Sequence, residues 1–145
     1  MVKYPLTFSV NSEVTPGIAS SWSTSVPTLT TPLTVAVPPE FEGPGGGYSP
    51  EDFYAIALLN CFAATFKVIA DRSKLSYESL SLSGTLTVDR GAGGAPVMKA
   101  FLLDGKLKGT GDRDRALRLL EKTSQSCLIL NSVSTEKTFQ FDVTE

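Results

Sequence analysis

The order of hydrophobic and polar residues predicts two short strands in the first part of the chain. Apolar residues alternate with polar ones over 4–10 and again over 33–37, which is the period of a half-buried strand. Pro5 favours a sheet edge or a strand start for the first of them. The stretch 11–31 is rich in Ser, Thr and Pro and is interpreted as irregular, with room for one strand near 20–24.

A glycine-rich loop then leads into a long helix predicted at about 50–71. Ser49 suits the N-cap, and Glu51 and Asp52 place negative charge at the positive end of the helix dipole. Between 53 and 69 the helix is apolar on nearly every face, so we expect it to be enclosed all round. A domain of this size has difficulty surrounding such a helix alone, which favours packing by a second subunit.

The second half of the chain predicts a hairpin, a helix and a final strand. Strict alternation over 80–88 indicates a strand, 90–94 supplies a glycine-rich turn, and 97–108 is its antiparallel partner. A second helix begins at Gly111-Asp112. One face of that helix carries Ala116, Leu120, Ser124 and Cys127, and the last strand carries Phe139, Phe141 and Val143. This order predicts an α+β fold in a single domain, 1–145.

Charge and composition make several partners unexpected. The 13 basic and 15 acidic residues form no block of like charge, so neither nucleic acid nor a membrane surface is an expected partner. The N-terminus alternates instead of joining a basic stretch to an apolar run, which is unlike a signal peptide, so a cytoplasmic location is expected. The most apolar stretch, 53–66, is short for a bilayer and is interpreted as a core helix.

The chain has no histidine and two cysteines. The absence of histidine excludes the usual Cys-His proteases, Ser-His-Asp hydrolases and Cys/His zinc sites, and no metal or cofactor is expected. In the cytosol a disulfide is normally catalytic or sensing, since the compartment keeps thiols reduced. Cys61 and Cys127 both lie on expected buried faces, so spacing alone leaves two readings open: inert packing, or a pair that meets.

The glycine loop and the residues after it resemble the OsmC/Ohr family. That family joins a Gly-rich loop to Asn/Ser-Pro-Glu-Glu, a buried helix and Ala/Ser-Cys-Phe; here those positions are Ser49 to Asp52, and Asn60 to Phe62. A second cysteine follows the amphipathic helix, as in the family. The resemblance implies an OsmC-like fold of antiparallel sheets around a long buried central helix, assembled as an intertwined homodimer.

The resemblance also implies a thiol-dependent peroxidase for organic hydroperoxides, active in oxidative stress. Cys61 would attack the peroxide and become a sulfenic acid, and Cys127 would resolve it into a disulfide. A dithiol or lipoyl reductant would then restore both thiols. An alkyl or fatty-acid hydroperoxide suits the apolar surroundings.

An apolar site raises the pKa of a cysteine, so a cation or hydrogen-bond donor is needed beside Cys61. Family members supply an arginine held by a glutamate, and Glu51 matches the glutamate. Because Glu51 lies ten residues before Cys61 on one helix, roughly 15 Å away, we expect it to act from the partner subunit. The alternative role for Glu51 is a helix-start carboxylate.

The family arginine has no match, since Glu40 occupies its loop position. Either Lys3, Arg72 or Arg115 substitutes for it, or turnover is lost. Three hypotheses follow: a peroxidase, a binding or redox-sensing module with an apolar interface pocket, or a dimer whose cysteines are core residues held out of disulfide reach. Leu128 is a second departure, because the family commonly has proline there.

Overall fold

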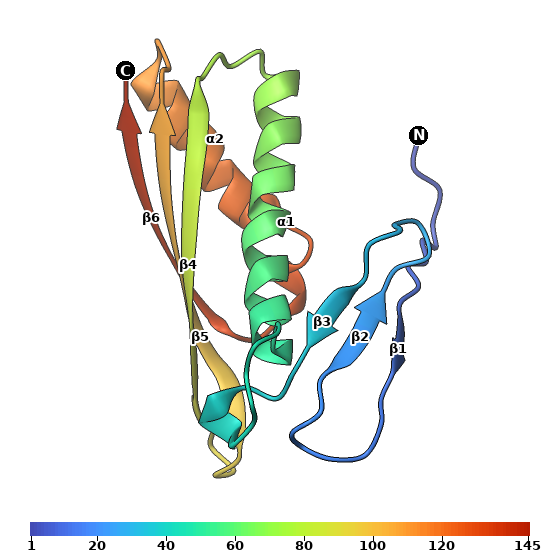
Figure 1. Ribbon diagram of the computed structural model, residues 1–145. Coiled ribbons are helices and arrows are strands. Elements are labelled where there is room, and N and C mark those ends of the chain that lie inside the picture. The colour runs from blue at the N-terminus through green and yellow to red at the C-terminus, as the bar shows by residue number, and fades with distance from the viewer. The chain divides into compact units, whose positions relative to one another are not determined.

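The computed structural model describes all 145 residues, which divide into two compact units, Met1–Phe53 and Tyr54–Glu145. Each unit contains one three-stranded sheet, and the chain has two α-helices (Figure 1). The α+β class expected from the sequence is therefore confirmed. Whether 1–145 acts as a single domain stays a prediction.

The first unit is built on a small antiparallel sheet. Its strands are β1 (Asn11–Glu13), β2 (Trp22–Ser25) and β3 (Leu33–Val35), in the order β1-β2-β3. β3 lies within the strand predicted over 33–37, and β2 lies near 20–24, where the sequence left room for a strand. β1 falls in the stretch interpreted as irregular. A short 3-10 helix, η1 (Pro39–Phe41), leads into the glycine loop.

The strand predicted over 4–10 does not form, and that prediction is wrong for the single chain. The segment has no regular structure, and its alternating apolar side chains, Tyr4, Leu6, Phe8 and Val10, are all exposed. Alternation specifies which face a strand would bury, but a strand also needs a neighbour to pair with its backbone. Within its own unit the segment has no such neighbour, because the sheet begins at Asn11.

The long helix α1 (Pro50–Arg72) begins at the residue that the sequence indicated. Its start is held by a reciprocal cap: the Asp52 amide donates to Ser49 Oγ at 3.0 Å, and the Ser49 amide donates to Asp52 Oδ2 at 2.9 Å. Two amide groups that the first turn leaves unpaired are satisfied in this way.

Only one stripe of α1 is buried within the single chain, so enclosure of the whole helix, which was expected to involve a second subunit, stays a prediction. The buried residues recur every fourth position: Leu58, Phe62, Phe66 and Ala70. A second set, Ile56, Asn60, Ala64 and Val68, is exposed and lies about 200° around the helix from the first. We call this second set the outer stripe. Its side chains are apolar except for Asn60, and nothing in the same chain covers them.

By length and composition alone, α1 could also cross a membrane, and it is the one helix in the chain that could. The segment 53–66 was expected to be too short to span a bilayer, but the whole helix is long enough. Core helices of water-soluble folds pass the same test, and the buried stripe of α1 packs into the core of the second unit.

The second unit has a sheet of three strands, β4 (Ser79–Arg90), β5 (Pro96–Lys108) and β6 (Glu136–Thr144). β4 and β5 form the predicted antiparallel hairpin, but β6 pairs with β5 in parallel. The expectation of antiparallel sheets is therefore corrected at this pair. The reason is the helix α2 (Arg113–Ser126), which carries the chain back before β6 begins.

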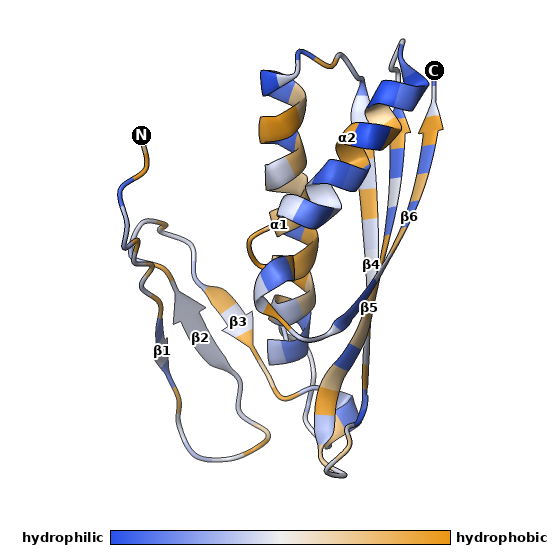
Figure 2. Ribbon diagram, turned by 180° about the vertical axis from the view of Figure 1, so that it is seen from behind, coloured by the Kyte–Doolittle hydropathy of each residue, from blue (hydrophilic) through white to orange (hydrophobic).

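Both helices cover the same face of this sheet. Side chains from that face of β5, chiefly Phe101, Leu103 and Leu107, join the buried stripe of α1 and Ala116 and Leu120 of α2 in one core. Hydrophobic and hydrophilic residues alternate along the strands, so the opposite face is largely polar (Figure 2). α2 starts where predicted, with Asp112 as its N-cap, and its buried face uses Thr123 where Ser124 was expected.

Candidate active site

Cys61 lies in the middle of α1, beside the buried stripe and within the second unit. It is half-buried and packs against the hydrophobic core. Its neighbour Phe62 is fully buried and stacks against Phe139 and Phe141 of β6, with ring centroids 6.1 and 5.6 Å away. These contacts fix the rotation of α1 on the sheet and so fix where the Cys61 sulfur points.

Cys127 ends α2 as its C-cap and is fully buried. Its backbone is extended, with φ −73° and ψ 119°, so the helix stops there and the chain turns into the short 3-10 helix η2 (Leu130–Ser132). The Asn131 amide donates to the carbonyl oxygen of Cys127 at 3.0 Å, which closes this turn. The end of α2 thus carries Cys127 into the core.

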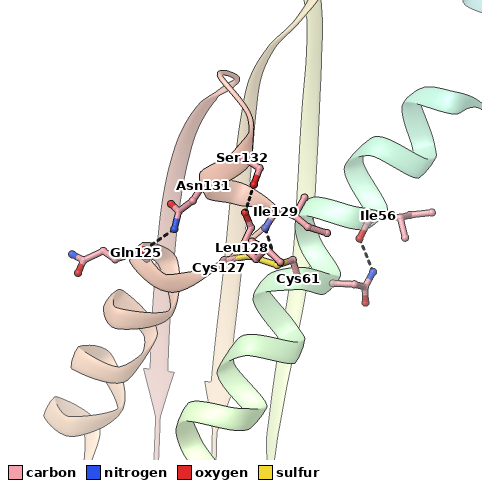
Figure 3. The surroundings of a disulfide bond; sticks show 9 residues. Ile56, Cys61, Gln125, Cys127, Leu128, Ile129, Asn131 and Ser132 are labelled. Carbon is pink, nitrogen blue, oxygen red and sulfur yellow. Dashed lines mark hydrogen bonds between the residues drawn. A yellow bond between two sulfur atoms is a disulfide. The ribbon is translucent and has the colours of Figure 1, made fainter. Parts of the chain in front are cut away.

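Cys61 and Cys127 are joined by a disulfide bond (Figure 3). Their Cα atoms are 6.1 Å apart, within the usual range for a disulfide, although the residues are 66 positions apart in the chain. The reading in which both cysteines are core residues held out of disulfide reach is therefore wrong. The bond links the middle of α1 to the end of α2.

The Cys61 sulfur accepts a hydrogen bond from the backbone amide of Ile129, at 3.3 Å. Figure 3 shows this amide pointing at the sulfur from the turn that follows Cys127. Sequence reasoning missed this contact, and no sequence signal reveals it, because every residue except proline carries such an amide.

The three cations proposed to replace the family arginine are Arg115 and Arg72 of the second unit and Lys3 of the first. The Arg115 guanidinium donates to the carbonyl oxygen of Ser73, beyond the C-terminal end of α1. Arg72 is exposed and lies 11 residues after Cys61, about 16 Å along the helix. Neither reaches the Cys61 sulfur within one chain. Lys3 belongs to the first unit, in the segment without regular structure.

Glu51 lies in the first turn of α1, in the first unit, while both cysteines belong to the second. Its Oε2 atom is buried and has no hydrogen-bond partner in the chain. A buried carboxylate oxygen without a partner is unfavourable, so a hydrogen-bond donor or a cation beside this atom would stabilise it. Its assignment to the partner's site stays a prediction.

A groove of about 470 Å³ runs along the side of α1 that faces α2. It begins near Thr65, one turn beyond Cys61, and near Ser126, next to Cys127. Ala64, Val68 and Ile69 supply apolar lining, and Arg72 and Lys122 also line it. Such a groove suits an apolar chain that ends in a negative charge. No group of three or more His, Cys, Asp or Glu side chains in the chain could hold a metal ion.

The sequence model of OsmC-like proteins matches residues 43–142, which include the glycine loop, α1, most of the second sheet and both cysteines. The chain belongs to the OsmC-like protein family. No curated protein matches it significantly.

Solved OsmC-like structures have the same fold at low sequence identity. An OsmC-like protein of unknown function from Vibrio cholerae is 17% identical, with a TM-score of 0.80 over 97% of this chain and 99% of its own. An organic hydroperoxide resistance protein OsmC from Legionella pneumophila is 20% identical, with a TM-score of 0.76 over 99% of this chain and 100% of its own. OhrB of Bacillus subtilis, an organic hydroperoxide resistance protein, is 15% identical, with a TM-score of 0.70 over 95% and 98%. At these identities the likeness establishes the fold.

Proposed function

We propose that this OsmC-like protein is a thiol-dependent peroxidase that reduces organic hydroperoxides through Cys61 and Cys127. The observation that carries the proposal is the disulfide, which joins two cysteines far apart in the chain at the junction of the two helices. Relatives of the same fold include organic hydroperoxide resistance proteins from L. pneumophila and B. subtilis. Membership of the family supports carrying this chemistry over to the chain.

The proposed reaction has three steps. The Cys61 thiolate attacks the terminal peroxide oxygen, the O–O bond breaks, and after protonation an alcohol leaves while Cys61 becomes a sulfenic acid. The Cys127 thiol then attacks that sulfur, releasing water and forming the disulfide. An external dithiol, such as a lipoyl group, reduces the disulfide by exchange and is itself oxidised to a cyclic disulfide.

A homodimer forms part of the proposal. Ile56 and Val68 of the outer stripe are 41% and 47% exposed, and the apolar side chains of 4–10 are exposed as well. Monomers rarely leave large contiguous apolar surfaces uncovered. A second copy packing on the outer stripe would also allow its Glu51 to approach Cys61. We place this reaction in the cytoplasm, where reversible disulfides are catalytic or sensing.

A binding or redox-sensing module is the second candidate, and one observation favours it. No lysine or arginine of the second unit donates a hydrogen bond to the Cys61 sulfur within the chain, so no direct partner there replaces the arginine of the family pattern. A thiolate less stabilised than in the family would react slowly with peroxide. Such a protein would bind an apolar ligand without catalysing peroxide reduction.

Thiol counting separates these two candidates. The reduced protein is treated with one equivalent of cumene hydroperoxide, and free thiols are counted before and after. The peroxidase loses both thiols and produces one equivalent of alcohol, whereas the sensing module keeps both on the timescale of turnover. Cys61→Ser abolishes peroxide consumption, while Cys127→Ser still consumes one equivalent and accumulates a sulfenic acid that dimedone traps. Unchanged thiols over hours would refute the peroxidase proposal.

A further inference from the structure

The Cys61 thiolate needs a stabilising group that its side-chain surroundings do not supply. No charged residue occurs from 57 to 65 on α1 or from 123 to 133 around the end of α2. Besides Cys127, the titratable side chains in the core against which Cys61 packs are Tyr54 and Tyr77. Arg72 and Lys122 line the neighbouring groove, and neither donates a hydrogen bond to the Cys61 sulfur. The Tyr54 hydroxyl shares a hydrogen bond with Thr135 Oγ1 at 2.5 Å, and the Tyr77 ring packs against Phe66.

The backbone amide of Ile129 donates a hydrogen bond to the Cys61 sulfur, at 3.3 Å. We propose that this amide stabilises the Cys61 thiolate in the reduced protein and so takes over part of the arginine's role in the family pattern. The proposal rests on the proposed function, since a stabilised thiolate matters for attack on peroxide. Hydrogen bonds to a charged sulfur are stronger than those to a neutral one, so the contact gains strength once the disulfide opens.

The turn that carries Ile129 is held by bonds that do not involve sulfur. The Ser132 amide donates to the Ile129 carbonyl oxygen at 3.0 Å, and Ser132 Oγ donates to the Leu128 carbonyl oxygen at 2.8 Å. Asn131 Nδ2 donates to the carbonyl oxygen of Gln125 at 2.8 Å. These contacts surround the peptide group between Leu128 and Ile129 and keep its N–H pointing toward α1 (Figure 3). A donor fixed in this way costs no reorganisation when charge appears on the sulfur.

Ile129→Pro tests the role of this amide because it deletes the N–H, although a proline at 129 also disfavours the helical turn in which Leu128 lies. The φ of Ile129 is −69°, which is the value that a proline ring imposes. The measurement is the pH dependence of iodoacetamide alkylation, together with thiolate absorbance near 240 nm, in a Cys127→Ser background that leaves Cys61 as the only thiol. We expect the pKa of Cys61 to rise, and alkylation at neutral pH to fall about tenfold.

Leu128→Pro is the matched control, since it places proline in the same turn and keeps the Ile129 amide. The residue before a proline must be extended, and Cys127 is extended already, with ψ 119°. Ile129→Ala is the second control, because it removes the side chain and keeps the N–H. Both are expected to leave the pH profile of alkylation unchanged.

Replacing the amide at 129 by an ester, through incorporation of an α-hydroxy acid, removes the N–H without a ring. This variant decides the matter if Ile129→Pro fails to fold. A pH profile identical to that of the parent in the ester variant would overturn the proposal. Because alkylation needs no peroxide, this result is independent of thiol counting: an unreactive parent in the peroxide assay would refute the proposed function and leave the role of the amide intact.

Discussion

A half-buried cysteine on an apolar helix reacts slowly unless a neighbouring group favours its ionised form. The groups of the proposed site in this chain are of two kinds, side chains and main chain. Cys61 and Cys127 are side chains that the two helices bring together, while the donor at Cys61 is a main-chain amide. Glu51 is the remaining predicted site residue, and its buried oxygen has no partner in the chain.

Glu51→Gln distinguishes an active-site role from a helix-start role. If the partner's Glu51 orients groups around Cys61, the variant lowers kcat/KM for cumene hydroperoxide about tenfold, a loss of roughly 1.4 kcal/mol in transition-state stabilisation. Its stability changes by about 1 kcal/mol or less, since only the interaction with the helix dipole is lost. Initial rates and urea denaturation measure the two effects separately.

Glu13→Gln serves as the control, because it removes one negative charge from the exposed strand β1 of the same unit. It is expected to change neither quantity. Full activity in Glu51→Gln, combined with reduced stability, would assign Glu51 to the helix start alone.

The two cysteines of the site could be predicted because side-chain identity, helix position and motif are written in the sequence. Cys61 lies beside the buried stripe of α1 and Cys127 ends α2, as their spacing indicated. The Ile129 amide could not be predicted, since its effect depends on how the turn after Cys127 is closed. The unpartnered state of the buried Glu51 oxygen could not be predicted either, because a residue pattern does not specify which donors surround a side chain.

At the scale of elements, close approach of α1 to the sheet depends on a glycine. A Cβ atom added at Gly84 of β4 would lie 2.5 Å from Phe101 Cζ and 3.4 Å from Leu59 Cδ1. Phe101 is 1% exposed, so its ring has little room to move. Gly84→Ala should therefore destabilise the fold by about 1–3 kcal/mol, the usual range for overpacking a core.

Urea denaturation of the reduced protein measures this change. Gly93→Ala is the matched control in the hairpin turn, because a Cβ there meets no atom within 4 Å and the φ of Gly93 is not in the left-handed region. It should be neutral or slightly stabilising through the unfolded state. Equal stability of both variants would show that β4 moves freely to accommodate the methyl group.

The groove between the helices makes a separate prediction about substrate choice. Arg72 and Lys122 line it together with apolar side chains, so a hydroperoxide that carries a carboxylate gains an ion pair there. Arg72→Gln should raise KM for a fatty-acid hydroperoxide about two- to fivefold, the size of a solvent-exposed ion pair, and leave KM for cumene hydroperoxide unchanged. Steady-state kinetics with both substrates measure the difference.

Arg118→Gln is the control for charge, because this exposed arginine of α2 does not line the groove. A parallel rise of KM for both substrates in Arg72→Gln would contradict the role of the groove in recognising a negative end. Equal effects of the two variants would indicate only a change in net charge.

The sequence predicted most elements because each buries one regular face in its own unit. β4, β5, β6 and both helices follow this rule, and their positions agree with the hydrophobic pattern. The parallel pairing of β6 was missed, since alternation gives the face of a strand and not its neighbour or direction. For the same reason, the segment 4–10 forms no strand in the single chain although its apolar and polar residues alternate, because alternation does not supply a neighbouring strand.

Two stretches of the chain have a hydrophobic pattern that predicts burial, although the single chain does not bury them. The segment 4–10 and the outer stripe of α1 are both apolar, and both are exposed in one chain. Selection for apolar residues at exposed positions is expected where a second copy buries them. The hydrophobic pattern therefore supports the proposed homodimer.

Ile56→Glu tests this assembly at the outer stripe. Ile56 is 41% exposed in the chain, so a carboxylate is tolerated in a monomer. In a dimer packed on the outer stripe, the same carboxylate would be buried without a partner, a cost of roughly 3 kcal/mol that raises the dissociation constant at least about a hundredfold. Light scattering across a concentration series measures the mass, with Gln140→Glu on the polar face of β6 as the control.

Peroxidase activity should follow the dimer if the partner supplies Glu51. Ile56→Glu then loses activity on dilution in step with its loss of mass, whereas the parent and Gln140→Glu keep their specific activity over the same range. Adding an inactive Cys61→Ser chain to Ile56→Glu provides a second test, because mixed dimers raise the specific activity only when one chain completes the site of the other. A parent protein that is monomeric at micromolar concentration and fully active would contradict both the interface and the shared site.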